Sequence, residues 1–360
     1  MIGIDVSRAN TQTRTGVEWY AFRLIQALKH VARDASITLY SPTPPLPDWG
    51  QFPERWRWKA LASPLKRLWN TIILRRELSR RTPAVFFTPA YGLLMPLPKK
   101  LRSVATIHDL AFITHPHLYS RWDRMLQRLV LRRTVRQACR IIVPSRATFD
   151  DLQRVYPIIP EEKIVIIPHG MHHPIPRHHE ERHPGSFLFV GRIEHKKNLL
   201  PFLDALEMLA HRRGFSDISI TLVGQRGYGF GTIRKLIQSC PRHIQWLGWV
   251  GEDTLDALRE RARFLALPSI VEGFGLPLLE AWEHGMIPIV TDIPALKEVG
   301  EDGAFYLNHK DPGSWPQRIE ELLRSPDEQQ KVLAAAKQRS RNFNWRQSAE
   351  ATLNVLTSCV

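Results

Sequence analysis

The sequence alternates, from one end to the other, between short apolar runs and longer segments with a helical period. Runs such as SITLY (36–40) and RIIVPS (140–145) have the length and composition of buried strands. Between them lie segments such as GVEWYAFRLIQALKHV (16–31), whose apolar residues recur every three or four positions. Strands that alternate with helices in this way form a parallel sheet with helices on both faces. The chain is therefore predicted to be an α/β protein.

The alternation breaks once, at PHGMHHPIPRHHEERHPGS (168–186). This stretch is rich in proline and histidine and has no apolar period, as expected of a linker. A second alternating series then begins with SFLFVGR (186–192) and continues through IPIVT (287–291). A chain of 360 residues also suits two hydrophobic cores better than one.

These observations predict two Rossmann-like, doubly wound domains that face a central cleft. We expect an N-terminal domain over residues 1–168, a linker over 169–185 and a C-terminal domain over 186–345. The last segment, 346–360, is predicted to be a helix that crosses back to the N-terminal domain.

The strongest motif is EGFGLPLLE, which begins at Glu272 directly after a predicted strand. Gly273 and Gly275 let the backbone approach a ligand closely and leave N–H groups pointing at it. A helix is predicted to start near Leu276, and a helix amino end favours a diphosphate. Glu280 lies one turn further on, where a carboxylate can accept hydrogen bonds from a ribose diol.

A second motif, VGRIEHKKN (190–198), follows the first strand of the second series. Arg192 and Lys197 would converge there on a diphosphate and stabilise the charge of a departing nucleotide. Lys196 is adjacent to Lys197, and the residues alone do not separate the two. The chain contains no Asp-x-Asp triplet of the kind that holds a metal, so cationic side chains are expected to replace the ion.

Two weaker signals lie in the first series. His108 and Asp109, in TIHDLAF, follow a predicted strand, so they should face the same cleft. Gly16, in RTGVEWY, opens the first predicted helix and could let the loop backbone donate to a phosphate. A single glycine also fits a simple turn.

The segment PSIVEGFGLPLLEAWEHGMIPIVTDIPALKEVGEDGAFYL (268–307) resembles the signature region of glycosyltransferase family 4, the retaining glycosyl transferases of group 1, which have the GT-B fold. The resemblance implies a role for each site residue. It implies that Glu272 contacts hydroxyls of the donor sugar, that Glu280 contacts the ribose, and that His108 lies beside the donor sugar. The backbone of Phe274, Gly275 and Leu276 would contact sugar and phosphate. Arg192 and Lys197 would contact the phosphates, and Gly16 would contact a phosphate.

The resemblance implies a metal-independent, retaining hexosyltransferase. Its donor would be a nucleotide sugar, with GDP-mannose the first choice and UDP-glucose, UDP-galactose and UDP-N-acetylglucosamine left open. The acceptor would be a glycan or a lipid-linked glycan in surface polysaccharide or lipopolysaccharide synthesis. One alternative is a sugar-nucleotide epimerase or phosphorylase of the same architecture. Another is a basic nucleic-acid-binding protein without catalysis, although the sequence shows no base-reading module.

Charge is distributed unevenly along the chain. The net charge is +15, and residues 1–168 hold 27 Lys and Arg against 12 Asp and Glu, whereas the remainder holds 23 of each. Residues 54–81 and 121–140 interleave these cations with Trp, Leu and Ile, which is typical of basic amphipathic helices at an anionic membrane surface. The alternative is that their apolar residues are ordinary core.

Three further expectations concern the surroundings of the protein. No apolar run approaches the ~20 residues of a membrane span, so we expect a cytoplasmic protein, peripheral on the inner face of the membrane. The three cysteines, Cys139, Cys240 and Cys359, are far apart and are expected to form no disulfide framework. Six histidines between His169 and His183 are read as a solvated linker rather than a zinc site, and Pro42–Pro53 as an exposed loop.

Overall fold

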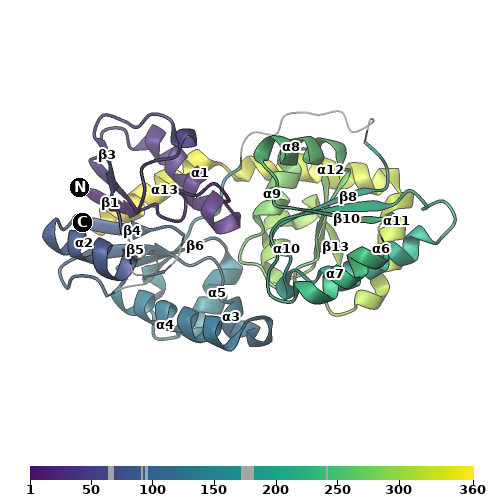
Figure 1. The fold of residues 1–360 in the computed structure, drawn as a ribbon, viewed down its shortest axis with the longest axis horizontal. Coiled ribbons are helices and arrows are strands. Elements are labelled where there is room, and N and C mark those ends of the chain that lie inside the picture. The colour runs from purple at the N-terminus through teal and green to yellow at the C-terminus, as the bar shows by residue number, and fades with distance from the viewer. Residues whose placement is uncertain (64–68, 91, 94–95, 172–181, 241) are drawn as a thin grey trace. The chain divides into compact units, whose positions relative to one another are not determined.

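The computed structural model describes residues 1–63, 69–90, 92–93, 96–171, 182–240 and 242–360. These residues form two compact units, shown in Figure 1. The first unit consists of Met1–Gly170 and Asn344–Val360, and the second of Met171–Phe343. Four of the six histidines between His169 and His183 lie outside the described residues.

The first unit is built on a seven-stranded sheet with the order β3-β2-β1-β4-β5-β6-β7, and all neighbouring strands are parallel. Its strands are β1 (Ile2–Asp5), β2 (Ile37–Ser41), β3 (Trp56–Ala60), β4 (Val85–Thr88), β5 (Arg102–Thr106), β6 (Arg140–Val143) and β7 (Ile164–Ile166). The order reverses between β1 and β4, so the loops after these strands flank the point where doubly wound sheets bind ligands.

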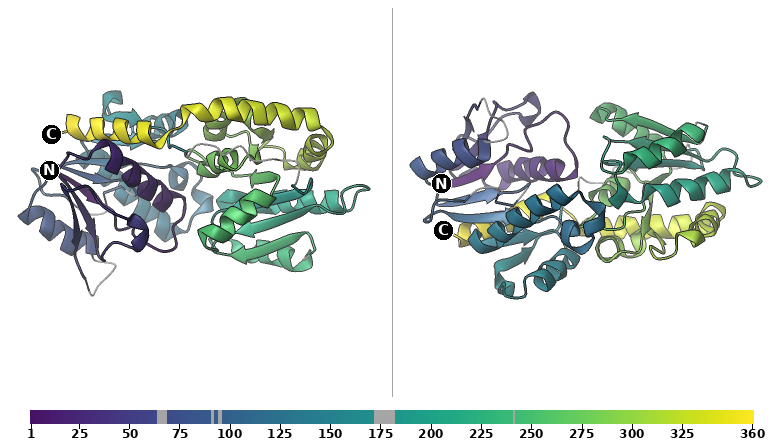
Figure 2. Two further views of the ribbon diagram at one scale, coloured as in Figure 1. Left: turned by 90° about the horizontal axis from the view of Figure 1, so that it is seen from above. Right: turned by 60° about the horizontal axis from the view of Figure 1, so that its bottom comes forward.

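The helices of the first unit are α1 (Gly16–Val31), α2 (Arg75–Arg80), α3 (Ala111–Thr114), α4 (Arg121–Gln137), α5 (Arg146–Val155) and α13 (Trp345–Ser358). Helices α1 and α13 lie side by side (Figures 1 and 2), so the carboxyl end of the chain packs on the helix that follows β1. Ser120 caps α4 by accepting a hydrogen bond from the Asp123 N–H at 3.2 Å.

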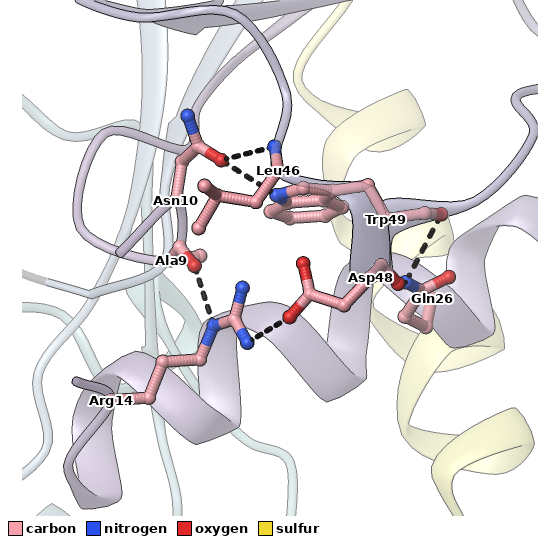
Figure 3. Close-up of polar contacts among 7 residues, drawn as sticks. All are labelled: Ala9, Asn10, Arg14, Gln26, Leu46, Asp48 and Trp49. Carbon is pink, nitrogen blue, oxygen red and sulfur yellow. Dashed lines mark hydrogen bonds and ion pairs between the residues drawn. The ribbon is translucent and has the colours of Figure 1, made fainter. Parts of the chain in front are cut away.

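The proline-rich segment after β2 is anchored to the loop between β1 and α1, as Figure 3 shows. The Asn10 side-chain oxygen accepts hydrogen bonds from the Leu46 N–H and from the Trp49 indole, at 3.1 and 2.9 Å. Arg14 donates to the Ala9 carbonyl at 2.7 Å and pairs with Asp48 at 2.5 Å. Trp49 is buried as a result. The expectation of a wholly exposed loop over Pro42–Pro53 is therefore wrong at Trp49, although the prolines around it do lie at the surface.

The second unit contains a six-stranded parallel sheet with the order β10-β9-β8-β11-β12-β13. Its strands are β8 (Ser186–Val190), β9 (Ser219–Val223), β10 (Ile244–Gly248), β11 (Phe264–Leu267), β12 (Ile287–Thr291) and β13 (Phe305–Leu307). The order reverses between β8 and β11, which repeats the pattern of the first sheet.

Helices cover both faces of the second sheet (Figure 1). They are α6 (Leu199–Ala210), α7 (Phe230–Ser239), α8 (Glu252–Arg261), α9 (Leu276–Glu283), α10 (Pro294–Gly300), α11 (Trp315–Arg324) and α12 (Pro326–Arg339). Successive residues of β8 enter different cores, because Phe187 packs among residues of α6 and α11 while Leu188 packs among residues of α8 and α9. The predicted α/β class with two parallel sheets is confirmed.

The basic segment 54–81 is not one continuous amphipathic helix: among its described residues, helical turns occupy only Trp69–Leu74 and α2. It begins with the strand β3, and Trp56 and Trp69 are buried in the first unit. Leu65 and Leu68 of this segment lie outside the described residues. The segment begins with a strand because Trp56 and Trp58 alternate with Arg57 and Lys59 at the period of a strand.

The expectation of three unpaired cysteines is also wrong. Cys139, directly before β6, forms a disulfide with Cys359, directly after α13, across 220 residues of sequence. The packing of α13 on the first unit brings the two residues together, and sequence distance carries no information on that contact. Cys240 is a free thiol.

His169 was expected in a solvated linker, but it is buried in the first unit. Its ring packs against Tyr20 and Trp345, with centroids 4.4 and 6.3 Å away. Gly170 follows it, and a Cβ there would lie 2.1 Å from the Trp345 backbone nitrogen. The segments by which the chain leaves and re-enters the first unit therefore pack directly on each other.

Candidate functional site in the second unit

The loops that follow β8 and β11 lie at the carboxyl edge of the second sheet, on either side of its switch point. They are joined by a backbone hydrogen bond of 2.9 Å from the Ile270 N–H to the Lys196 carbonyl. The two motifs singled out in the sequence thus belong to a single site, because each follows one of these neighbouring strands.

Lys197 and Glu272 form an ion pair across the two loops. The Lys197 Nζ lies 2.5 Å from the Glu272 Oε1, and the Ser269 hydroxyl donates to the same oxygen at 2.7 Å. Both charged side chains are largely buried, at 13% and 11% exposure. The structure therefore brings the predicted phosphate-binding cation and the predicted sugar-binding carboxylate into direct contact.

Arg192 differs from Lys197 in its environment. It is exposed, and within the described part of the chain it forms no ion pair or hydrogen bond through its side chain. Its stem packs by Gly227, where a Cβ would approach the Arg192 Cγ to 2.8 Å. The guanidinium is thus held at the sheet edge with its charge directed to solvent.

The glycine in front of α9 has a conformation that other residues rarely adopt. Gly275 has a φ of 91°, and a Cβ there would lie 2.4 Å from the Leu296 Cδ2. Phe274 buries its side chain in a core cluster with Phe343, and Leu276 is also buried. Only the backbone of Phe274, Gly275 and Leu276 remains to meet a ligand at this end of α9.

Glu280 lies one turn into α9 and is 8% exposed. Its Oε2 accepts a hydrogen bond of 3.0 Å from the Nη2 of Arg259, on α8. The predicted ribose-binding carboxylate therefore has a buried cationic partner that the sequence motif did not reveal.

The remaining predicted residues, His108 and Gly16, lie in the first unit. The His108 Nε2 is 2.8 Å from the Pro89 carbonyl, and the His108 carbonyl accepts from the Thr148 hydroxyl at 3.4 Å. Burial lowers the pKa of His108, which favours a neutral ring that donates its Nε2 proton to Pro89. Asp109 accepts from the Ala111 N–H at 3.0 Å and so orders the turn after β5.

Gly16 is the first residue of α1, and a Cβ at this position would meet no atom within 4 Å. Thr15 precedes it, and the Thr15 N–H donates to Glu18 at 3.1 Å. No close approach of other parts of the chain requires glycine here. A bound phosphate or a simple turn both remain compatible with this geometry, so the role of Gly16 stays a prediction.

Two partners of the site were missed in the sequence. Ser269 could have been found, because a serine three residues before Glu272 is well placed to donate to its carboxylate. Arg259 could not, because it lies 21 residues before Glu280 on another helix. Among the described residues, no three His, Cys, Asp or Glu side chains form a group that could hold a metal ion.

Each half of the chain matches a known family of glycosyltransferases. Residues 14–173 match the family described as Glycosyltransferase Family 4, and residues 175–339 match the family described as Glycosyl transferases group 1. The chain belongs to the group 1 glycosyl transferases of family 4, as its motifs predicted.

Curated relatives include several mannosyltransferases of bacteria. The serotype-specific mannosyltransferase WbdA of Escherichia coli is 33% identical over 177 residues, which are 48% of this chain and 21% of that protein. The chain thus spans about a fifth of the length of this relative. The O-antigen chain mannosyltransferase RfbU of Salmonella typhimurium is 23% identical over 346 residues, which are 90% of this chain and 91% of the relative.

Solved structures share the fold at low identity. WaaG, a glycosyltransferase involved in lipopolysaccharide biosynthesis, superimposes with a TM-score of 0.74 at 14% identity, over 99% of this chain and all of that one. HepE of Anabaena, in complex with UDP and glucose, gives a TM-score of 0.73 at 14% identity over 99% of both chains. The predicted GT-B fold is confirmed, whereas the cleft between the domains stays a prediction.

Proposed function

We propose that this protein is a retaining, metal-independent glycosyltransferase that moves a hexose from a nucleotide sugar to a glycan or lipid-linked acceptor. The observation that carries the proposal is the ion pair of Lys197 and Glu272 at the switch point of the second sheet. A buried cation beside a buried carboxylate at this edge of the sheet can bind a ligand that carries both phosphates and hydroxyls. A nucleotide sugar carries both groups.

The proposed role of Lys197 follows from electrostatics. A diphosphate carries more negative charge than a single carboxylate, so it competes for the Lys197 Nζ when it binds. Glu272 then accepts hydrogen bonds from sugar hydroxyls, still held by the Ser269 hydroxyl at 2.7 Å. Lys197 and Arg192 stabilise the charge that builds on the phosphate as the glycosidic bond breaks. In this account side chains do what a metal does in other enzymes.

The stereochemical part of the proposal rests on family membership. The acceptor attacks the same face that the nucleotide leaves, and the departing phosphate takes the acceptor proton. The His108 carbonyl is proposed to stabilise the cation-like sugar, and the neutral ring would donate to Pro89 throughout.

Mannose, carried as GDP-mannose, is our first choice of donor. The names of the relatives WbdA and RfbU support mannose, while HepE binds UDP and glucose, which keeps UDP-sugars open. A thermal-shift panel of GDP, UDP and ADP in EDTA tests the proposal, because a ligand that binds only the folded chain raises its melting temperature. We expect one nucleotide to stabilise clearly more than the others. Stabilisation by none of them would contradict a nucleotide-sugar enzyme.

The acceptor is proposed to lie at an anionic membrane surface, and helix α4 supports this. Trp122, Met125, Leu126 and Leu129 follow one another at the i, i+3, i+4 and i+7 positions of a single helical face, and they are between 51% and 76% exposed. Exposed arginines stand beside them on α4, namely Arg121, Arg128, Arg132 and Arg136. An apolar stripe with cationic flanks fits the interface of an anionic bilayer.

Within the residues that the structure describes, no helix combines the length and the apolar content that crossing a membrane requires. On the basis of the α4 surface, we propose a peripheral enzyme on the cytoplasmic face of the inner membrane, with no nucleic acid among its partners. Synthesis of surface polysaccharide or lipopolysaccharide takes place on such a surface and is supported by the names of the relatives.

Vesicle co-sedimentation tests this docking. Phosphatidylcholine vesicles with phosphatidylglycerol should bind the protein, and binding should fall as salt rises, because charges are screened beyond about 10 Å at 0.1 M. The double variant Trp122→Ser, Leu129→Ser should bind less, while Met208→Ser, at an exposed apolar residue of the second unit, should not change binding. Replacing Arg75, Arg76, Arg80 and Arg81 by Ser should weaken binding without abolishing donor hydrolysis. Equal binding to neutral and anionic vesicles would contradict the proposal.

A further inference from the structure

Behind the proposed donor site, a buried arginine of α8 is surrounded by carboxylates of α8 and α9. Arg259 is only 4% exposed, and its Nη2 lies 3.0 Å from the Glu280 Oε2. Its Nη1 lies 3.0 Å from the Asp256 Oδ1 and 3.6 Å from the Glu252 Oε2. Three carboxylates thus surround a single guanidinium.

The three carboxylates differ in their burial. The side chains of Glu252 and Asp256 are 43% and 50% exposed, whereas that of Glu280 is 11% exposed. Solvent screens the first two, so the pair with Glu280 is the interaction that Arg259 makes in a low-dielectric environment. Burial disfavours the charge of Arg259, yet Glu280, Glu252 and Asp256 together hold its pKa above the usual value.

A buried ion pair of this kind is a poor way to gain stability. Removing two charges from water costs several kcal/mol each, and apolar residues of similar size often stabilise as well or better. The fold alone therefore gives no reason for an arginine at this position. The orientation of Glu280 gives a reason, because a carboxylate that accepts hydrogen bonds from a ligand binds best when it is fixed before the ligand arrives.

We propose that Arg259 is a positioning residue of the donor site, which fixes the Glu280 carboxylate and turns it toward the ribose hydroxyls of the nucleotide. The inference rests on the proposed function, because it requires Glu280 to bind ribose. The Arg259 guanidinium, on α8, donates a hydrogen bond to the Glu280 Oε2. The more exposed carboxylates of Asp256 and Glu252 hold Arg259 in place. Arg259 itself touches no ligand.

Nucleotide titrations with the full chain test the proposal. The probes are GDP and UDP, each compared with its 2′-deoxy analogue, and whichever parent binds more tightly is used throughout. Replacing Glu280 by Gln should weaken binding by roughly 10- to 100-fold, since a charged hydrogen-bond partner is lost. It should also reduce the preference for ribose over 2′-deoxyribose.

The Arg259→Met variant should weaken binding to a similar extent and reduce the same ribose preference. In the Glu280→Gln background, Arg259→Met should have little further effect, because both changes remove the same interaction. Arg259→Lys, which keeps the charge, should restore part of the affinity. The donor KM should rise in Arg259→Met much more than kcat falls, because ribose binding is the same in the ground and transition states.

Arg263→Met is the matched control. Arg263 lies four residues further on, between the end of α8 and β11, is partly buried, and donates to Gln329 rather than to Glu280. It should leave nucleotide affinity and ribose preference unchanged. If Arg259→Met proves unfolded by circular dichroism, Arg259→Gln takes its place with the same expected results.

The outcomes separate the two proposals. Unchanged affinity and unchanged ribose preference in the Arg259 variant, with both altered in Glu280→Gln, would overturn the role of Arg259 alone. Unchanged behaviour of Glu280→Gln would overturn the ribose role of Glu280 and with it the inference. Failure of both GDP and UDP to bind the unaltered chain would overturn the proposed function itself.

Discussion

The two units share a sheet order but use charge in opposite ways. In the second unit, cations at the sheet edge and behind it meet carboxylates, as Lys197 meets Glu272 and Arg259 meets Glu280. In the first unit, the cations greatly outnumber the acids, and those of α4 lie on the surface beside an exposed apolar stripe. The same fold thus carries buried ion pairs at a sheet edge in one unit and, in the other, an exposed basic and apolar surface that we propose docks on a membrane.

The difference also concerns how each unit fixes its loops. The second unit holds its site loops with charged side chains, whereas the first fixes the loop before α1 with Asn10, Arg14 and the buried Trp49 (Figure 3). Removing a charge should therefore affect chemistry in the second unit. In the first unit, changes should affect stability and surface binding.

The largest expected effect is that of Lys197. Replacing it by Met should lower turnover by ~10²–10³, because a cation that stabilises the developing phosphate charge is lost. Arg192→Met should act in the same direction. The measurement is the initial rate of sugar release from the donor in EDTA.

Lys196→Met provides the control for this variant. Lys196 is the neighbouring residue, is similarly buried, and lies 3.6 Å from Glu194 instead of Glu272. The turnover of the Lys196→Met variant should stay within a few-fold of the turnover of the unaltered chain. Equal losses in the Lys196 and Lys197 variants would mean that general positive charge, and not the ion pair with Glu272, governs the rate.

A pair of glycine substitutions compares the helix starts of the two units. Gly275→Ala should destabilise the fold by about 1–3 kcal/mol, because its φ of 91° is strained for alanine and the Cβ meets Leu296. Gly16→Ala should change stability by less than about 0.5 kcal/mol, because a Cβ there meets no atom. Urea denaturation measures both.

The donor KM of Gly16→Ala then sharpens the comparison. A raised KM with unchanged stability would support a phosphate at the start of α1. An unchanged KM would identify Gly16 as part of a simple turn. Equal destabilisation by the two substitutions would contradict the described geometry of Gly275.

A further expected effect is a pH dependence of stability in the first unit. Burial holds the pKa of His169 well below 6.5, and the neighbouring His108 lowers it further. Below pH 6.5 the unfolded chain therefore binds a proton that the folded chain does not, so stability falls as pH falls. The slope is at most about 1.4 kcal/mol per pH unit for this residue.

Calorimetric melting between pH 7.5 and 5.5 measures this slope. His169→Phe, which can pack between Tyr20 and Trp345, should make it shallower. A slope of the same size in the variant would show that other groups cause the acid sensitivity.

Much of the fold and part of the site could be predicted from the sequence. The alternation of strands and helices is a local pattern, so both parallel sheets were predictable. Glu272 and Lys197 each follow a strand, and the carboxyl ends of parallel strands meet at one edge, so their proximity was predictable as well. The strand at Trp56 was predictable from its period of two, but the density of cations suggested a helix instead.

Contacts between distant segments could not be predicted. The disulfide of Cys139 and Cys359 depends on how α13 packs, and the pair of Arg259 and Glu280 depends on how α8 and α9 pack. Burial of His169 likewise depends on Tyr20 and Trp345. None of these leaves a local period or motif, because each arises from tertiary packing.

The central claim is that the protein transfers a sugar without a metal and with retention of configuration. Its most direct test follows the transfer reaction in EDTA by ¹H NMR. GDP-mannose and the UDP-sugars are supplied in turn as donors, together with a lipid-linked acceptor. We predict turnover of one donor without any added metal, with a product whose anomeric configuration equals that of the donor. An absolute requirement for Mg²⁺ or Mn²⁺, or a product with inverted configuration, would contradict the account.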